Sequence, residues 1–266
     1  MNDWRSYDDV AETYERVNAP RFAAPGRDLV ALAAPPAGGR ILDVGTGTGV
    51  VAEAAAEAVG PEGMAVGVDV SLSMMNAGRG RRSLPHFVAG EAIDLPFRGG
   101  TFDAVAGNFV VAHFTRAETA LFDMLRVLRP GGRLALSSWP AGEDELEKTW
   151  RSLVQEVVQE ELLRDVELRA APGRERFGKR ESIEETLIDA GLRHVRTEQR
   201  EYRFVFTVEE YVAGRSTWAV GRFVREMLGP QRFEDFLART RGVFAEHFAD
   251  PLHDFRDVWL AVGTKP

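Results

Sequence analysis

The stretch Ile41-Leu42-Asp43-Val44-Gly45-Thr46-Gly47-Thr48-Gly49-Val50 runs from an apolar segment into three alternating glycines. The residues that follow it, 51–57 (VAEAAAE), are typical of a helix. Glycine permits a positive φ and lets a ligand approach the backbone, while the first turn of a helix offers unpaired N–H groups. A strand, a tight turn and a helix in this order predict a nucleotide-like ligand, although such turns also occur simply to pack a helix on a strand.

A second apolar segment, Val66-Gly67-Val68-Asp69-Val70, ends in a carboxylate 20 residues after Gly49. In doubly wound sheets an acid at this place accepts hydrogen bonds from a ribose diol. The dinucleotide fingerprint Gly-x-Gly-x-x-Gly is not met, because Val50 stands where its last glycine belongs. The pattern therefore favours a ribose-bearing ligand and disfavours a nicotinamide cofactor.

Three further motifs follow downstream. They are residues 90–97 (GEAIDLPF), 101–105 (TFDAV) and 125–134 (LRVLRPGGRL). With the glycine turn they resemble the class I S-adenosylmethionine-dependent methyltransferases. The closest resemblance is to the subgroup of the ubiquinone and menaquinone C-methyltransferases and many small-molecule methyltransferases of bacterial secondary metabolism, and it covers about residues 41–139.

This resemblance implies a Rossmann-like α/β fold with a seven-stranded, mostly parallel sheet, helices on both faces and a helical cap over the substrate. Strand and helix signals alternate up to Trp139, as such a sheet requires. We expect strands at 39–44, 64–69, 86–90, 104–108, 133–138, 192–206 and 259–263, and helices at 7–17, 26–34, 144–163 and within 208–248. A further helix should end at Pro130-Gly131-Gly132, and Ser182 with Glu185 has the spacing of a capping box before a stop at Gly191.

The expected elements divide the chain into six parts. They are N-terminal helices and a lid (1–38), the cofactor-binding core (39–141), a first helical cap segment (142–180), a core helix with strand 6 (181–207), a second helical cap segment (208–250) and the final strand (251–266).

Composition is that of a globular protein, because 44% of the 266 residues are hydrophobic and 28% are charged. The chain has no cysteine, which excludes disulfides and thiolate sites, and we expect no metal. It shows no apolar signal core and no stretch of the ~20 apolar residues that a membrane span needs, so the cytoplasm is the expected location. We expect a monomer or a homodimer.

The net charge of −8 argues against a nucleic acid partner, because binding to a phosphate backbone depends on Lys and Arg. No Asn-Pro-Pro-Tyr-like tetrapeptide, the mark of many base-directed methyltransferases, follows the fourth expected strand. A small-molecule methyl acceptor is therefore expected.

The resemblance assigns residues to the cofactor S-adenosyl-L-methionine, whose product is S-adenosyl-L-homocysteine. Gly45, Thr46 and Gly47 should lie against its aminoacyl and ribose parts, and Asp69 and Val70 against its ribose, although Asp69 has an alternative role as a helix N-cap. The remaining assignments are Met74 beside the adenine, Glu91 and Ala92 near the adenine amine, where the family usually has Asp-Ala, and Asn108 at the amino group or simply in a turn.

Two further residues have a functional and a structural reading. Tyr14 resembles an N-terminal aromatic that closes over the methionine end of the cofactor as part of a mobile lid, or it packs its helix onto the domain. His113, just beyond Asn108, is the candidate general base if the acceptor needs one, or it caps or packs the next helix. Asp43, inside an apolar strand, should organise the glycine turn.

The predicted function is therefore an S-adenosylmethionine-dependent methyltransferase acting on a small hydrophobic or aromatic metabolite. Aromatic residues concentrated in 204–248 suit such an acceptor, although most of them are expected in the core. The alternatives are a protein of this fold that binds the cofactor alone or catalyses another reaction, and an NAD-dependent oxidoreductase.

Overall fold

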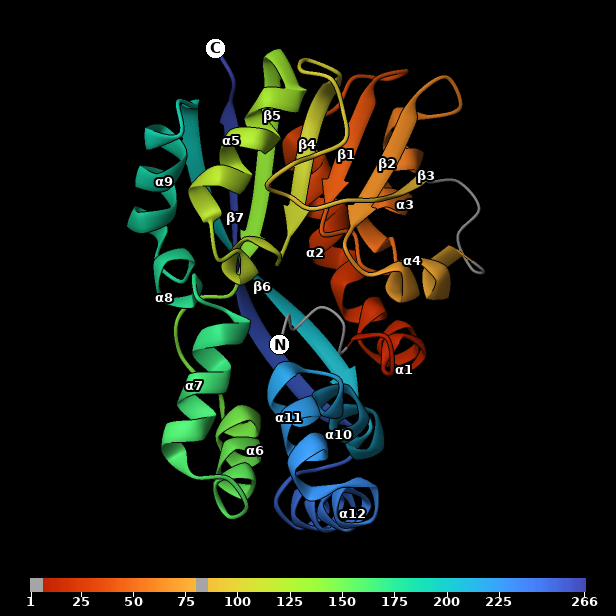
Figure 1. The fold of residues 1–266 in the computed structure, drawn as a ribbon, viewed down its shortest axis with the longest axis vertical. Coiled ribbons are helices and arrows are strands. Elements are labelled where there is room, and N and C mark those ends of the chain that lie inside the picture. The colour runs from red at the N-terminus through yellow and green to blue at the C-terminus, as the bar shows by residue number, and fades with distance from the viewer. Residues whose placement is uncertain (1–6, 80–85) are drawn as a thin grey trace.

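The protein folds around one seven-stranded sheet. A computed structural model describes residues 7–79 and 86–266. In spatial order the strands are β3 (His86–Ala89), β2 (Met64–Asp69), β1 (Arg40–Val44), β4 (Phe102–Asn108), β5 (Leu128–Ser138), β7 (Leu252–Thr264) and β6 (Arg193–Phe206). The first five strands are parallel, and β7 is antiparallel to both its neighbours. The predicted α/β fold class, a mostly parallel sheet with helices on both faces, is confirmed (Figure 1).

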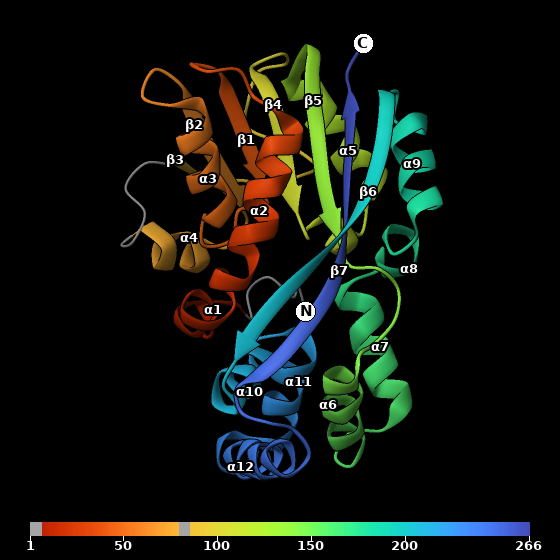
Figure 2. The same cartoon turned by 180° about the vertical axis from the view of Figure 1, so that it is seen from behind.

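Helices cover both faces of the sheet, because successive residues of a strand point to opposite sides. Ile41 of β1 packs in one cluster with α2 (Ala19–Ala33) and α3 (Val50–Val59). Its neighbour Leu42 packs in a second cluster with α5 (Ala117–Val127) and α9 (Arg180–Asp189). Figure 1 shows α5 in front of the sheet, and Figure 2, seen from the opposite side, shows α2 and α3 in front of it. A ligand can therefore approach the central strands at their carboxyl ends.

A layer of helices lies beyond those carboxyl ends (Figure 1). It contains α6 (Glu145–Gln155), α7 (Glu160–Ala170), α8 (Arg174–Phe177), α10 (Val208–Ser216), α11 (Ala219–Leu228) and α12 (Pro230–His247). Strands β6 and β7 continue into this layer and stay paired as far as Phe206 opposite Leu252. Helix α1 (Ala11–Val17) contacts both α10 and α4 (Leu72–Arg79), and so links the layer to the edge of the sheet.

Several expected boundaries are wrong. The helix expected at 144–163 is two helices, α6 and α7, with residues 156–159 between them. The capping box of Ser182 and Glu185 is also wrong, because α9 begins at Arg180 and places both residues inside the helix. The turn before α9 is fixed by the Gly178 carbonyl, which accepts hydrogen bonds from Trp259 Nε1 and the Ala141 backbone N–H. A complete capping box stands instead at the start of α10, with Thr207 and Glu210.

Other elements differ in length. Helix α1 begins at Ala11, and α2 begins at Ala19 because Pro20 fits the first turn of a helix. Helix α5 ends at Val127, before the predicted Pro130 stop, and the chain continues directly into β5. Strand β7 begins at Leu252, seven residues before the expected start at Trp259, because it keeps pairing with β6 outside the central sheet.

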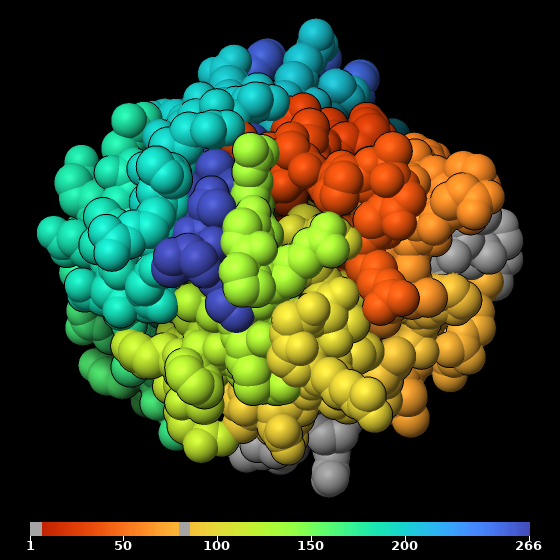
Figure 3. All heavy atoms as spheres, turned by 90° about the horizontal axis from the view of Figure 1, so that it is seen from above, coloured from red at the N-terminus to blue at the C-terminus, as the bar shows by residue number. Residues whose placement is uncertain are grey.

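The end of the sheet opposite the helical layer is closed by main-chain hydrogen bonds near the C-terminus. Gly131 donates to the Lys265 carbonyl at 2.8 Å, and Lys265 donates to the Gly132 carbonyl at 2.9 Å. Figure 3 views this end, with the C-terminal residues in blue beside the green segment at the start of β5. Within the described ranges, no helix is long and apolar enough to cross a bilayer.

Candidate functional site

A cavity of about 990 Å³ lies between the carboxyl ends of the parallel strands and the helical layer. One part of its wall comes from the glycine turn after β1, the end of β2 and the end of β4. The rest comes from α1, α2, α4, the segment after β3, the end of β5, and the helices α6, α7, α8, α10 and α11 with β7. It is the place where an open α/β sheet binds ligands, with a helical layer closing it.

The glycine turn adopts the backbone that its sequence predicts. Gly45, Gly47 and Gly49 have φ values of +70°, +55° and +89°, in the left-handed region that disfavours side chains. A Cβ on Gly45 would also lie 2.2 Å from Val110 Cγ2, so this position has no room for a side chain. The turn therefore needs glycine for its own conformation as well as for the approach of a ligand.

Asp69 holds this turn in place from the end of β2. Its Oδ2 accepts a hydrogen bond from the Gly47 N–H at 2.7 Å, and its Oδ1 accepts one from the Ser71 N–H at 2.9 Å. Burial raises the pKa of Asp69, and these backbone bonds oppose the rise. A carboxylate has about four lone-pair sites, so each oxygen keeps the capacity to accept a second donor. This spare acceptor capacity matches the two hydroxyl donors of a ribose.

Asp43 is the buried acid that the sequence placed behind the turn. Its Oδ2 accepts a hydrogen bond from the Thr46 hydroxyl at 2.6 Å. Burial raises the pKa of Asp43 to about 7; the Thr46 hydrogen bond opposes this rise, and the nearby Asp69 adds to it. Asp43 therefore acts on the turn through Thr46.

This raised pKa predicts a pH-dependent stability. Between about pH 4, the pKa of an unfolded Asp, and pH 7, the native protein binds a proton that the unfolded chain releases, so stability should fall as pH rises. Asp43→Asn should reduce the fall in unfolding free energy between pH 5 and pH 8 by about 1–3 kcal/mol. Urea denaturation of both proteins at the two pH values measures this. Equal falls in the variant and the parent would contradict the buried, protonated Asp43.

Asn108 ends β4 beside the turn. Its side-chain Oδ1 accepts a hydrogen bond from the Ser137 hydroxyl at 2.6 Å, and the same hydroxyl accepts one from the Phe109 N–H at 2.9 Å. Phe109 has φ +55°, an uncommon value for a bulky residue. Such strain persists where surrounding contacts fix it, and it is common at ligand sites.

Every predicted cofactor residue lines this cavity, and so does His113. These are Tyr14, Gly45, Thr46, Gly47, Asp69, Val70, Met74, Glu91, Ala92 and Asn108. The ring of Tyr14 lies edge-on to Tyr7 and stacks on Phe22, with centroids 6.3 and 6.1 Å apart. Burial, followed by the nearby Tyr7 and Asp69, raises the pKa of Tyr14, so its hydroxyl stays protonated at neutral pH.

An aromatic surface continues from Tyr14 toward the helical layer. Phe22 lies 5.3 Å from Phe109, and Phe109 stacks on Trp139 at 4.2 Å. All three line the cavity. Of the aromatic residues that the sequence placed in 204–248, Trp218 alone lines it, while Phe204, Phe206, Tyr211, Phe236 and Phe244 are buried in the core. The apolar surface that faces a ligand thus comes mainly from α2 and from the ends of β4 and β5.

His113 lies in a short 3₁₀ turn (Val111–His113) at the cavity. Its Nδ1 is 2.7 Å from the carbonyl oxygen of Ala170 at the end of α7. A carbonyl can only accept, so Nδ1 carries the hydrogen and Nε2 is the proton-accepting nitrogen of the neutral ring. This arrangement suits a general base oriented by its neighbour, and it equally ties α7 to the core.

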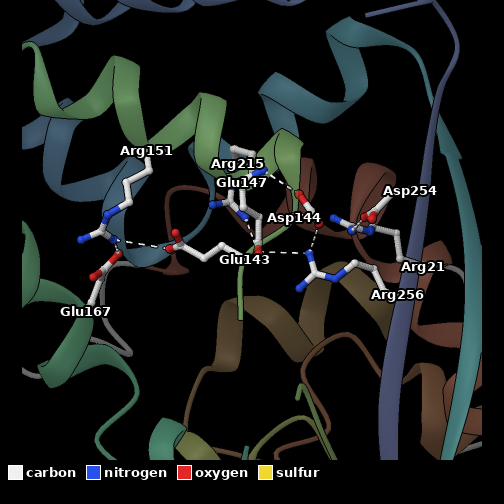
Figure 4. A network of polar contacts seen from close by, with 9 residues as sticks. All are labelled: Arg21, Glu143, Asp144, Glu147, Arg151, Glu167, Arg215, Asp254 and Arg256. Atoms are coloured by element: carbon white, nitrogen blue, oxygen red, sulfur yellow. Dashed lines mark hydrogen bonds and ion pairs between the residues drawn. The ribbon is translucent and has the colours of Figure 1, made fainter. Parts of the chain in front are cut away.

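Charged residues line the part of the cavity that faces the helical layer (Figure 4). Arg256 Nη1 lies 2.6 Å from Asp144 Oδ2 and 3.2 Å from Glu147 Oε1, and Arg215 Nη1 lies 3.3 Å from the same Glu147 oxygen. Beside this group, Arg21 pairs with Asp254 at 3.0 Å. No sequence motif marks this set, because its members come from four separate elements, α2, α6, α10 and β7. The sequence contains a weak indication that Phe109 and Trp139 belong to the site, since each directly follows the end of an expected strand.

These residues fit S-adenosyl-L-methionine. The turn offers backbone N–H groups and close approach, Asp69 offers spare acceptor capacity for two hydroxyls, and buried Met74 offers an apolar surface beside Gly47. No group of three or more potential metal ligands occurs in residues 7–79 and 86–266.

Comparison with known proteins identifies the core of this chain. Residues 42–136 match the methyltransferase domain family. A demethylmenaquinone methyltransferase of Roseiflexus castenholzii is 41% identical over 139 residues, which are 49% of this chain and 57% of that protein. The ubiquinone/menaquinone biosynthesis C-methyltransferase of Pseudomonas fluorescens is 41% identical over 104 residues, 37% of this chain and 41% of that protein. The chain thus spans about half the length of the curated relatives it matches.

Solved structures support the fold. A methyltransferase structure from Bacillus halodurans superposes with a TM-score of 0.58 and 19% identity, covering 91% of this chain and 99% of that one. A structure from Thermotoga maritima superposes with a TM-score of 0.56 and 18% identity, covering 99% and 100% of the two chains. Residues 42–136 therefore form a methyltransferase domain of the S-adenosylmethionine-dependent class, and this part of the chain is similar to the demethylmenaquinone and the ubiquinone/menaquinone biosynthesis C-methyltransferases.

Proposed function

We propose that the whole chain transfers a methyl group from S-adenosyl-L-methionine to a small aromatic acceptor. The observation that carries this proposal is that one cavity contains both the cofactor motif and the aromatic surface of Phe22, Phe109 and Trp139. The names of the relatives, which act in quinone biosynthesis, also support a ring-bearing acceptor. In assays of methyl transfer, quinone precursors are therefore the first acceptors to test, before compounds of secondary metabolism.

The residues of this chain act chiefly by alignment. When bound, the cofactor supplies an electrophilic methyl group on a sulfonium. Asp69 and the glycine turn hold the ribose end, while the stacked Phe109 and Trp139 offer a flat face to the acceptor at the end of β4 and β5. Holding reactants about 3–3.5 Å apart and aligned contributes much of the rate of such a transfer. Tyr14 and Tyr7, above the turn, would exclude water as a lid.

Calorimetric titration tests the cofactor assignment. The protein, freed of co-purified ligand, is titrated with S-adenosylmethionine, S-adenosylhomocysteine and NAD. Micromolar binding of both adenosyl compounds and no binding of NAD is the expected result. Binding of NAD alone would overturn the proposal in favour of an oxidoreductase. Binding of the adenosyl compounds without turnover of any aromatic acceptor would favour a cofactor-binding protein or another reaction.

We predict that His113→Ala lowers turnover with a hydroxyl acceptor by about 100-fold while leaving the affinity for S-adenosylhomocysteine unchanged. The reason is that His113 lines the cavity and that the hydrogen bond between its Nδ1 and the Ala170 carbonyl orients the ring. Steady-state kinetics and calorimetry measure the two effects. His253→Ala, which changes an exposed histidine outside the cavity, is the matched control. Unchanged turnover in folded His113→Ala would leave this residue with a packing role.

A further inference from the structure

The charges around the helical part of the cavity are unevenly distributed. At one side Arg151 faces three carboxylates, those of Glu143, Glu160 and Glu167, with an Arg151–Glu160 distance of 3.0 Å. At the other side two guanidinium groups that line the cavity contact one carboxylate, and a third lies near enough to lower its pKa. These are Arg215 and Arg256, with Arg174 as the third, and the carboxylate is that of Glu147. The first side carries excess negative charge and the second excess positive charge.

The positive side stays positive after its ion pairs are counted. Glu147 and Asp144 together neutralise two of the three guanidinium groups. Burial alone would raise the pKa of Glu147, but Arg215, Arg256 and Arg174 outweigh it and hold that pKa below its usual value. Glu147 is therefore ionised at neutral pH, and one positive charge remains without a carboxylate.

Arg256 directs part of its guanidinium group away from these carboxylates (Figure 4). Nη1 makes both contacts with Asp144 and Glu147, and no hydrogen bond joins Nη2 or Nε to any described residue. The guanidinium carbon lies 5.1 Å from the centre of the Trp139 ring, which itself stacks on Phe109. Arg256 thus lies over part of the Trp139 ring, and its donors stand next to the rest of the aromatic surface, against which the acceptor ring would lie.

Arg174 supplies a second cation at the same wall. It is exposed, it lines the cavity from the start of α8, and no ion pair joins its side chain to the part of the chain that the structure describes. Guanidinium groups bind carboxylates with parallel N–H···O bonds, which fixes both position and orientation.

We propose that the acceptor is an aromatic compound that bears a carboxylate, and that Arg256 and Arg174 bind this carboxylate while the ring lies against Trp139 and Phe109. This inference rests on the proposed function, because it names the acceptor class of the same site. The family match ends at residue 136, before Trp139 and all the charged residues of this wall.

Binding of three probes to the protein saturated with S-adenosylhomocysteine tests the proposal. The probes share one ring system and differ in charge: 2-naphthoate, 2-naphthol and 2-naphthylmethylamine. Calorimetry should show that 2-naphthoate binds about tenfold more tightly than 2-naphthol, the effect of one charge-assisted hydrogen bond, and that the amine binds most weakly. Tighter binding of the naphthol or of the amine would overturn the carboxylate assignment.

Two substitutions locate the effect. Arg256→Met should weaken 2-naphthoate binding more than tenfold, and Arg174→Gln about fivefold, with the affinity for 2-naphthol nearly unchanged. Arg174→Gln breaks no ion pair with residues 7–79 or 86–266, so it keeps the test valid if Arg256→Met fails to fold. Arg225→Gln, an exposed arginine on α11 outside the cavity, is the control. Equal affinity for 2-naphthoate in the parent and folded Arg174→Gln would overturn the role of Arg174. Failure to bind S-adenosylhomocysteine would instead overturn the proposed function.

Discussion

Asp69→Ala is expected to weaken binding of S-adenosylmethionine by about 1–3 kcal/mol, because the substitution removes the acceptors for two ribose hydroxyls. The same carboxylate accepts hydrogen bonds from Gly47 and Ser71, so its loss also releases the glycine turn. Calorimetry with S-adenosylhomocysteine gives the change in affinity. Asp69→Asn, which keeps one acceptor oxygen, should fall between the parent and Asp69→Ala.

Asp235→Ala is the control for this experiment, because Asp235 is exposed on α12 and lies outside the cavity. Its affinity should equal that of the parent. If folded Asp69→Ala also kept the parental affinity, the end of β2 would not be the ribose site, and the carboxylate would serve only the turn.

Gly78→Ala is expected to destabilise the protein by about 2–3 kcal/mol and to weaken cofactor binding. Gly78 lies in α4, where a Cβ would be 1.8 Å from the backbone oxygen of Thr48 in the glycine turn. A backbone atom cannot rotate away, so α4 or the turn must move. Urea denaturation measures the stability, and calorimetry with S-adenosylhomocysteine measures the second effect.

Gly242→Ala provides a control of opposite sign. Gly242 also lies inside a helix, α12, but no heavy atom stands within 4 Å of a Cβ built there. Alanine should stabilise that helix by up to about 1 kcal/mol, because glycine loses more conformational freedom on folding. Equal effects of the two substitutions would show that helix propensity, and not the contact with Thr48, governs Gly78.

The sequence predicted the sheet well, because its central strands are buried on both faces and their apolar runs stop at glycine or at a polar residue. The strand at Met64–Asp69 was predicted with both its ends. The long β7 was predicted only from Trp259. Its first seven residues mix buried and exposed side chains, and their strand conformation depends on pairing with β6, which is distant in sequence. The capping box at Ser182 was wrong because the four-residue pattern can also lie within a helix.

The two parts of the cavity were not equally predictable. The motif residues Gly45, Gly47 and Asp69 are local in sequence, and the structure brings them together at one edge of the sheet. Arg215 and Arg256 meet Glu147 only because three separate elements converge, and nothing local in the sequence marks that convergence. Their roles, like those of the cofactor residues, stay predictions that the proposed substitutions test.

Strand β6 enters the helical layer and β7 leaves it side by side, since Phe206 pairs with Leu252. The 45 residues between them therefore form an insert whose two ends meet on one hydrogen-bonded ladder. An insert of this kind can be lengthened, shortened or exchanged while the ladder keeps its register and the sheet keeps its shape. The fold thus separates what must stay constant for the cofactor from a replaceable piece that supplies Arg215 and Trp218 to the cavity. Replacing that piece would reshape one wall of the cavity while Asp69, the glycine turn and Arg256 stay where they are.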